Sequence, residues 1–171
     1  MFPADVDSTI SEAEGRALAE LARDRIVLEL GAWLGRSTVC MGQTAAQLVS
    51  VDWHRGDEHA GNRSTLPGFV QSLDRYGLAE RVVTVVARFE DVLPLLAPAS
   101  FDLVFLDGFH SYEQVSADIG LARRVLKPGG AMAFHDYGVE GFGVARAVDE
   151  VFGQPSQIVD TLAVVNPIGG V

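Results

Sequence analysis

The chain has 171 residues, of which 48% are hydrophobic and 21% charged, a composition typical of one globular domain with its own core. Its net charge of −10 argues against nonspecific binding to nucleic acid or to an anionic membrane, since lysine and arginine supply most of the affinity for such partners. The single cysteine, Cys40, excludes an internal disulfide, and the sequence shows neither a secretory signal nor a membrane span, so we expect a cytoplasmic protein.

Helical and extended patterns alternate along the chain. A helix is expected at 11–23, because Ser11 and Glu14 have the spacing of a capping box and apolar residues then recur at helical intervals. The other helices are expected at 37–47, 68–76, 90–96, 112–125 and 143–151. Strands are expected at 26–30, 48–52, 82–87, 101–106, 131–134, 157–160 and 162–165. The sequence L-K-P-G-G at 126–130 is predicted to end a helix with a turn.

This alternation predicts an α/β fold with a doubly wound, mostly parallel sheet whose apolar strands are covered on both faces. The last two strands are almost contiguous, which favours a closing antiparallel hairpin. We expect a single domain over 1–171, with an N-terminal helical segment at 1–24. Residues 54–67 are polar and without a clear period, and a loop of that length in a compact domain is usually functional or mobile, so this segment is a candidate lid.

The sequence E-L-G-A-W-L-G-R-S at 29–37 directly follows the apolar run 26–28. A strand, a glycine-bearing turn and a helix hold nucleotide-type ligands on open α/β sheets. A pyrophosphate-binding turn needs a second glycine two residues after the first, where the backbone approaches the phosphates, but this chain has Trp33 there. We therefore expect the turn to suit a nucleoside ligand without phosphates rather than a dinucleotide.

Acidic, aromatic and histidine residues follow the predicted strands, and in parallel sheets such residues meet at one edge and share a ligand site. Asp52, about twenty residues beyond the glycine turn, has the position of an acid that binds a ribose diol. The alternative for Asp52 is a helix cap or a turn residue. Trp53 and Phe89 could each stack on an adenine ring or belong to the core. Asp107 could hold an ammonium group or a metal, or cap the helix that begins at Tyr112.

Five motifs in this order resemble those of class I S-adenosylmethionine-dependent methyltransferases: E-L-G-A-W-L-G-R-S, V-D-W, F-D-L-V-F-L-D-G-F-H-S-Y-E, L-K-P-G-G and F-H-D. The small branch with D-G-x-H-S-Y-E after the fourth strand and H-D after the fifth is the most similar. The resemblance covers nearly the whole chain from Ile26 onward. It implies a Rossmann-like, seven-stranded sheet of order 3-2-1-4-5-7-6, which agrees with the expected hairpin. It also implies methyl transfer from S-adenosylmethionine to a small molecule, with oxygen as the expected acceptor atom.

The same resemblance implies the residues that bind the cofactor. Glu29, Gly31 and Gly35 would surround its methionine part and ribose. Asp52 would take the ribose hydroxyls, and Arg88 and Phe89 would border the adenine. Trp33 and Ser37, beside the glycines of the turn, and Trp53, which could stack on the adenine, are further cofactor-binding candidates. Asp107, followed by Gly108, would approach the amino-acid end.

Removing a proton from an oxygen acceptor requires a general base or a metal ion. His110 and His135 follow neighbouring strands in the family's order, and histidine is the natural proton acceptor near pH 7, so these two residues and Asp136 are the catalytic candidates. The alternative is a divalent cation held by Asp107, His135 and Asp136, because related methyltransferases of the catechol type place a cation at matching strand ends. Since magnesium prefers oxygen ligands, we favour the histidines. His135 and Asp136 could also form a hydrogen-bonded pair that shapes the edge of the ligand site and has no catalytic role.

Two other functions compete with methyl transfer. A nicotinamide-dependent oxidoreductase could use a similar sheet, but Trp33 argues against it. The chain could also be a cofactor-binding protein without transfer activity, but the acids and histidines that follow the strands argue against this interpretation. The chain carries no large inserted substrate domain, so the acceptor is either small or reached through a partner subunit or a second copy, and a homo-oligomer is compatible with this reading.

Overall fold

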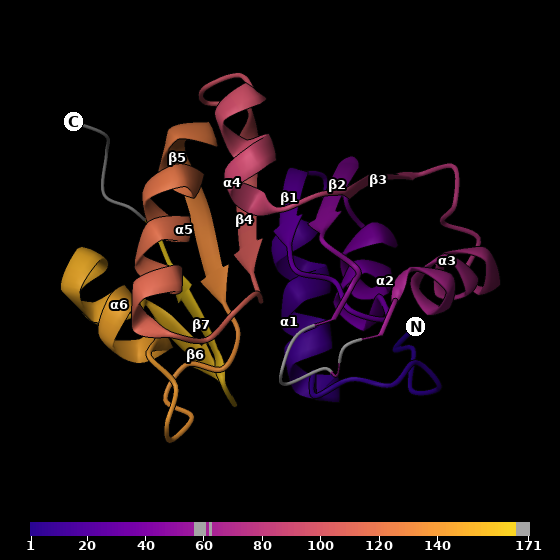
Figure 1. Cartoon of the computed structure of the whole chain (residues 1–171), viewed down its shortest axis with the longest axis horizontal. Coiled ribbons are helices and arrows are strands. Elements are labelled where there is room, and N and C mark those ends of the chain that lie inside the picture. The colour runs from indigo at the N-terminus through magenta and orange to yellow at the C-terminus, as the bar shows by residue number, and fades with distance from the viewer. Residues whose placement is uncertain (57–60, 62, 167–171) are drawn as a thin grey trace.

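The computed structural model describes residues 1–56, 61 and 63–166. Seven strands form one sheet (Figure 1): β1 (Ile26–Leu30), β2 (Gln47–Asp52), β3 (Val82–Val86), β4 (Phe101–Leu106), β5 (Leu126–Phe134), β6 (Gln157–Val159) and β7 (Leu162–Val165). The helices are α1 (Glu12–Ala22), α2 (Arg36–Gly42), α3 (Leu66–Arg75), α4 (Phe89–Val92), a 3-10 turn η1 (Leu93–Leu95), α5 (Tyr112–Val125) and α6 (Val144–Phe152).

The strand order is β3-β2-β1-β4-β5-β7-β6, which confirms the predicted sheet. Strands β1 to β5 are parallel to one another, whereas β7 pairs antiparallel with both β5 and β6. The predicted closing hairpin is therefore present. Its two strands are short, and β6 forms one edge of the sheet.

Two local predictions were wrong. The stretch 126–130 ends helix α5 at Val125 as predicted, but it belongs to β5, which already begins at Leu126, and is not a turn that precedes the strand. The pairing of β4 with β5 shifts between Phe101 and Leu103, so this stretch is accommodated as an irregularity of the ladder, with Gly129 at a φ of +77°. Helix α2 ends at Gly42 instead of 47, because β2 begins at Gln47, where the backbone N–H groups of Ala46 and Gln47 donate to the carbonyl of Arg25.

Helices cover both faces of the central strands. One buried cluster joins α1, α2 and α3 to one face of the sheet, and it contains Leu18, Val39 and Phe69. The other cluster joins η1, α5 and α6 to the opposite face, and it contains Leu93, Ile119 and Val148. The central strands are buried on both sides, as a doubly wound sheet requires.

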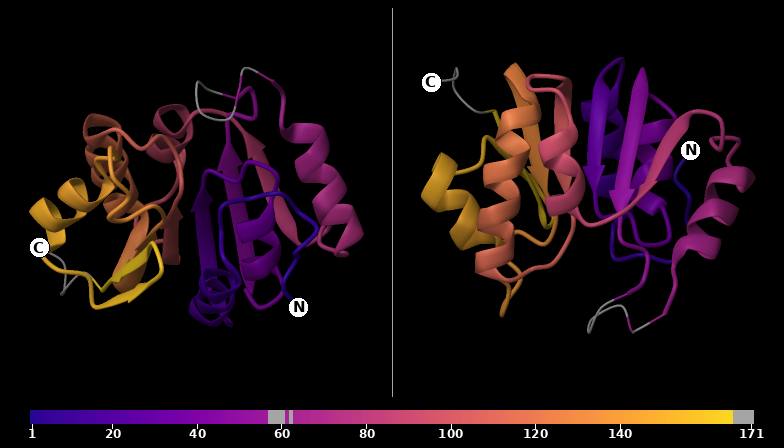
Figure 2. Two further views of the ribbon diagram at one scale, coloured as in Figure 1. Left: turned by 90° about the horizontal axis from the view of Figure 1, so that it is seen from below. Right: turned by 45° about the horizontal axis from the view of Figure 1, so that its top comes forward.

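The edge strand β3 departs from this pattern. Figure 1 and the right view of Figure 2 show β2 with no helix in front of it, and Val83 of β3 is 59% exposed. Helix α4, which follows β3 in the chain, has only four residues and does not cover this face of β3. Coverage of both faces was thus predicted correctly for the central strands and wrongly for β3. None of the helices in the described ranges has the length and apolarity that a membrane crossing requires.

Candidate functional site

The register of the sheet aligns the carboxyl ends of its central strands. Leu30, the last residue of β1, pairs with Val51 of β2 and with Leu106 of β4, and Leu106 pairs with Phe134, the last residue of β5. The backbone continues this alignment, because the N–H of Asp107 donates to the carbonyl of Leu30 at 2.8 Å. The segments that follow these strands therefore share one edge, as the sequence predicts.

The glycine turn after β1 is held by Asp52. Gly31 and Gly35 have φ angles of +94° and +93°, a region that glycine adopts without steric cost. One carboxylate oxygen of Asp52 accepts the N–H groups of Ala32 and Trp33 at 2.8 and 2.9 Å, and the other accepts the N–H of His54 at 2.6 Å. Asp52 thus fixes the turn itself, in addition to any contact that it makes with a ligand.

Backbone strain concentrates at this edge of the sheet. Of the six described non-glycine residues with positive φ, three follow β1, β2 and β5: Trp33 (+45°), His54 (+52°) and Asp136 (+59°). Such conformations cost about 1–3 kcal/mol each and recur at ligand sites, where the surrounding structure maintains them. The indole N–H of Trp33 is buried and has no hydrogen-bond partner among the described residues.

Glu29 lies beneath the turn and is fully buried. Its carboxylate accepts hydrogen bonds from the hydroxyls of Ser37, Thr38 and Ser50 at 2.6–2.7 Å. Burial raises the pKa of Glu29 to about 7, although these three hydrogen bonds oppose the shift. Glu29 and Ser37, both predicted to bind cofactor, therefore contact one another and tie the start of α2 to the sheet.

The residues predicted near an adenine ring form two groups. The guanidinium carbons of Arg55 and Arg88 lie 4.8 and 5.0 Å from the ring centre of Trp53, which is 37% exposed. Phe89 packs on Gly108 so closely that a Cβ atom at position 108 would lie 2.7 Å from its ring. A purine stacking on Trp53 would share the ring with two cationic side chains, whereas Phe89 lies against the end of β4.

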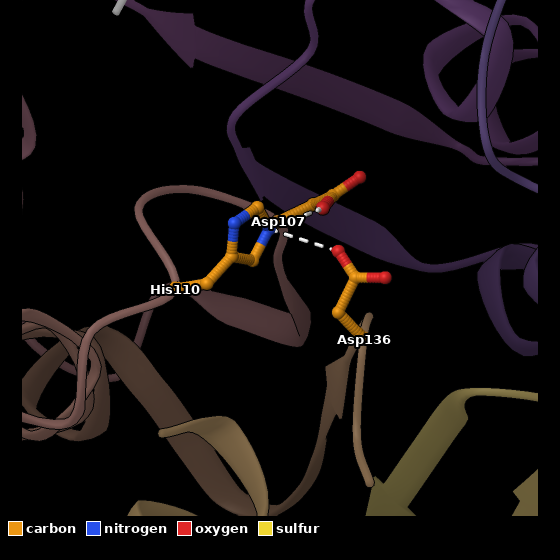
Figure 3. Close-up of side chains that lie close together, drawn as sticks. All are labelled: Asp107, His110 and Asp136. Carbon is orange, nitrogen blue, oxygen red and sulfur yellow. Dashed lines mark ion pairs between the residues drawn. The ribbon is translucent and has the colours of Figure 1, made fainter. Parts of the chain in front are cut away.

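Three ligand-type side chains converge where β4 and β5 end (Figure 3). Nε2 of His110 lies 2.9 Å from a carboxylate oxygen of Asp136 and 3.9 Å from one of Asp107. One ligand atom from each of Asp107, His110 and Asp136 lies within 4.8 Å of the other two, which is close enough for one metal ion. Ser111, and not Asp107, caps α5, so the capping alternative for Asp107 is wrong.

His135 is buried behind this cluster and contacts three carboxylates. Its Nδ1 lies 3.3 Å from oxygens of both Asp107 and Asp136, and its Nε2 lies 3.4 Å from an oxygen of Glu14. These contacts lack the geometry of directed hydrogen bonds, so their attraction is mainly electrostatic. Burial lowers the pKa of His135, but the three carboxylates outweigh it and raise the pKa to about 12.

The remaining charges of the cluster follow the same logic. Burial opposes ionisation of His110 as well, but Asp107 and Asp136 raise its pKa to about 9. Burial would raise the pKa values of Asp107 and Asp136, yet the two histidines hold both below their usual range. The cluster therefore favours protonated imidazole rings beside ionised carboxylates.

The structure adds one residue to the predicted set. Glu14 was recognised only as part of a capping box, and that box is present. The same carboxylate also reaches His135, more than a hundred residues away in the sequence. The sequence pattern identifies Glu14 as a capping residue, but no local pattern connects α1 with the end of β5. Residues 57–60 and 62 of the candidate lid lie outside the described residues, and its last two residues, Leu66 and Pro67, belong to α3.

An open α/β sheet with a glycine turn after β1, an acid after β2 and a charged cluster after β4 and β5 defines a Rossmann-like protein with a ligand site at its carboxyl edge. A family model described as a methyltransferase domain matches residues 28–137, which contain all of these features. The chain belongs to this methyltransferase family.

Two curated relatives are about equally similar to the chain. The uncharacterized protein y4gI of Sinorhizobium fredii is 31% identical over 140 residues, which cover 76% of this chain and 15% of that protein. The catechol O-methyltransferase of Mycobacterium tuberculosis is 32% identical over 149 residues, which cover 82% of this chain and 62% of that protein. The chain thus spans less than two thirds of the length of either relative.

Solved structures share the fold. The O-methyltransferase TomG from Streptomyces achromogenes, involved in tomaymycin synthesis and crystallised in complex with SAM, superposes with a TM-score of 0.71 at 21% identity. The match covers 97% of this chain and 83% of TomG. It shows that nearly the whole chain adopts the architecture of this class.

Proposed function

We propose that this protein transfers a methyl group from S-adenosylmethionine to an oxygen atom of a small-molecule acceptor, with a divalent cation held by Asp107, His110 and Asp136. The convergence of these three side chains beside the glycine turn carries the proposal. Membership of the methyltransferase family supports the transfer. A curated relative named as a catechol O-methyltransferase supports an oxygen acceptor.

The glycine turn suits the cofactor. Gly31 approaches the carbonyl of Asp107 so closely that a side chain at position 31 would collide with it. Glycine at this position therefore lets the turn lie against the end of β4. The buried N–H of Trp33 is a donor that an acceptor atom of a ligand can satisfy. S-adenosylmethionine, when bound, supplies an electrophilic methyl group attached to a sulfonium. Trp33 also supports a transferase over the competing nicotinamide enzyme, because it fills the position where a pyrophosphate needs glycine.

The donor set suits a divalent cation that accepts mixed ligands. Two carboxylates and one imidazole are ordinary ligands of manganese, iron or zinc, whereas magnesium prefers oxygen throughout. Such an ion, when bound, supplies positive charge that promotes ionisation of an acceptor hydroxyl. We assign the imidazole ligand to His110 and not to His135, because Nδ1 and Nε2 of His135 both face carboxylates from within the core.

The two histidines then have different roles. His135, with a pKa of about 12, keeps its proton and balances the negative charge of the carboxylates around it. His110, whose side chain is about 20% exposed, is the less buried of the two and faces Asp107 and Asp136 through Nε2. Its pKa of about 9 means that it must lose a proton before it accepts one from an acceptor or binds a cation. In this proposal the position of the acceptor between Asp107, His110 and the cofactor methyl group provides most of the rate acceleration.

The test is a transfer assay with methyl-labelled S-adenosylmethionine. Catechols and other hydroxylated small molecules are offered as acceptors, with manganese, magnesium or a chelator. We expect labelled product with at least one acceptor, its loss on chelation and its loss in Asp136→Asn. Calorimetry measures cofactor binding separately. Absence of cofactor binding at sub-millimolar concentration would overturn the proposal, and activity that survives chelation would remove the cation from it.

A further inference from the structure

We propose that Glu14, on helix α1, is a positioning residue of the site: its carboxylate fixes the ring of His135 so that Nδ1 faces Asp107 and Asp136. Its effect on methyl transfer rests on the proposed function, but its effect on the His135 ring does not. The proposal places a residue of the N-terminal segment behind a cluster formed by β4 and β5.

Glu14 joins three parts of the chain at one buried point. Its side chain is about 1% exposed. One carboxylate oxygen accepts the N–H and the hydroxyl of Thr161, in the turn between β6 and β7, at 2.9 and 2.8 Å. The other accepts the N–H of Ser11 at 2.8 Å and lies 3.4 Å from Nε2 of His135.

Helix capping alone does not explain this placement. A capping box requires one oxygen to reach the backbone N–H of the N-cap residue, and the Ser11 contact provides it. A capping side chain normally stays at the surface, whereas a buried carboxylate is unfavourable unless a cation lies beside it. In the described part of the chain, Nε2 of His135 is the side-chain nitrogen within ion-pair distance of Glu14, at 3.4 Å.

The geometry makes Glu14 the fixed end of a chain of contacts. Thr161 and Ser11 hold its carboxylate, the carboxylate faces Nε2 of His135, and Nδ1 of the same ring lies equally far from Asp107 and Asp136. Because carboxylates attract the imidazole at both nitrogens, the ring keeps the two aspartates at a set separation. Loss of the contact at Nε2 frees the ring, and the spacing of the aspartates relaxes with it.

The test compares Glu14→Gln with Thr161→Val. The glutamine keeps the size of the side chain and removes the charge that faces His135. Because its amide nitrogen cannot accept, it also loses the hydrogen bond from the N–H of either Ser11 or Thr161. The valine removes a hydrogen bond to Glu14 and leaves its charge in place, which makes it a control for structural anchoring alone. Glu14→Asp is the second variant: it keeps the charge but withdraws it from the ring by one methylene group.

Two readouts separate this inference from the proposed function. In the ligand-free protein, nitrogen-15 NMR of the His135 ring should show an Nε2–H that exchanges slowly in wild type and Thr161→Val and rapidly in Glu14→Gln and Glu14→Asp. With manganese alone as the probe, both Glu14 variants should bind the ion about tenfold or more weakly, and Thr161→Val within about twofold of wild type.

A slow Nε2–H in Glu14→Gln, or equal effects of Glu14→Gln and Thr161→Val on both readouts, would overturn the positioning role. A wild-type protein that binds no manganese would refute the proposed cation, and the ring readout would still decide the role of Glu14. If Glu14→Gln does not fold, Glu14→Asp decides in the same way.

Discussion

The carbonyl oxygen of Asp107 lies directly against Gly31, so that no side chain fits at position 31. Gly31 also has a φ of +94°, which an L-residue adopts at a cost. Two independent constraints therefore require glycine at the start of the turn: the backbone conformation and the approach of β4.

Replacement of Gly31 by alanine should lower the free energy of unfolding by about 2 kcal/mol or more, since strain and collision add. It should also weaken binding of S-adenosylmethionine at least about tenfold, because the turn must move away from Asp107. The matched control is Gly77→Ala, where φ is +68° and a Cβ atom meets nothing within 4 Å. Urea denaturation and calorimetry should show a small stability loss and unchanged cofactor binding for the control. Equal losses in both variants would contradict the role of the Asp107 contact.

His135 and His110 should differ in how strongly they stabilise the fold. His135→Gln leaves the buried carboxylate of Glu14 and the half-buried ones of Asp107 and Asp136 without the imidazole and should cost about 3 kcal/mol of unfolding free energy. His110→Gln removes a ring that is about 20% exposed, and its smaller cost should accompany a larger loss of methyl transfer. Urea denaturation of both variants, followed by the transfer assay on the folded fraction, checks the pair. A mild effect of His135→Gln would show that its charge is not needed.

Glu29 should make the stability of the protein depend on pH. Its pKa is about 7 in the folded chain, against an ordinary value of 4.5, so folding favours the protonated form. Stability from this group is complete below pH 4.5 and is lost as the pH rises through 7. The shift corresponds to about 3 kcal/mol between these limits.

Glu29→Gln cannot ionise and should lack this slope. Urea denaturation at pH 5 and pH 8 should therefore show the variant gaining about 2.5 kcal/mol relative to wild type at the higher pH, since part of the stability is already lost at pH 5. The comparison of two pH values cancels any fixed cost of replacing an oxygen that accepts from Ser37, Thr38 or Ser50. Parallel pH dependence of the two proteins would show that Glu29 ionises in the folded state as readily as in the unfolded chain.

The sequence predicted those parts of the fold that local pattern determines. The strands at 26–30, 101–106 and 162–165 and the helix at 112–125 have the expected bounds. The predicted strand start at 131 was wrong, because Leu126 already pairs with Phe101 of β4. The ladder then resumes at Ala131, so the lysine, proline and two glycines between them form an irregularity within the strand.

For the site, the sequence predicted which residues meet but not the environment of each one. Asp107, His110, His135 and Asp136 meet because parallel strands align their ends, and this follows from strand order alone. The separate environments of the two histidines did not follow from it. They depend on Glu14, whose position is set by packing of α1 against the turn before β7, and spacing in the sequence does not encode that contact.

Arg36 connects the glycine turn to the N-terminal segment. It is the first residue of α2, and its guanidinium donates to the backbone carbonyls of Val6, Ser8 and Ile10 at 2.7–3.0 Å. The segment also reaches α3, where Asp5 accepts from Arg75 and Tyr76. A cation bound by carbonyl oxygens from a neighbouring segment holds that segment in place without an acidic partner.

Arg36→Ala should release residues 4–10 and lower the free energy of unfolding by about 2 kcal/mol, the scale of charge-assisted hydrogen bonds. Hydrogen exchange should show faster amide exchange in this segment, while the strands of the sheet keep their protection. Arg16→Ala is the matched control, because its exposed ion pair with Glu12 should contribute less than about 1 kcal/mol. Since α1 follows the segment directly, release of 4–10 should also speed exchange at Glu14, the residue that reaches His135. Unchanged exchange at both places in Arg36→Ala would show that Asp5 and the buried Val6 and Ile10 hold the segment without the guanidinium.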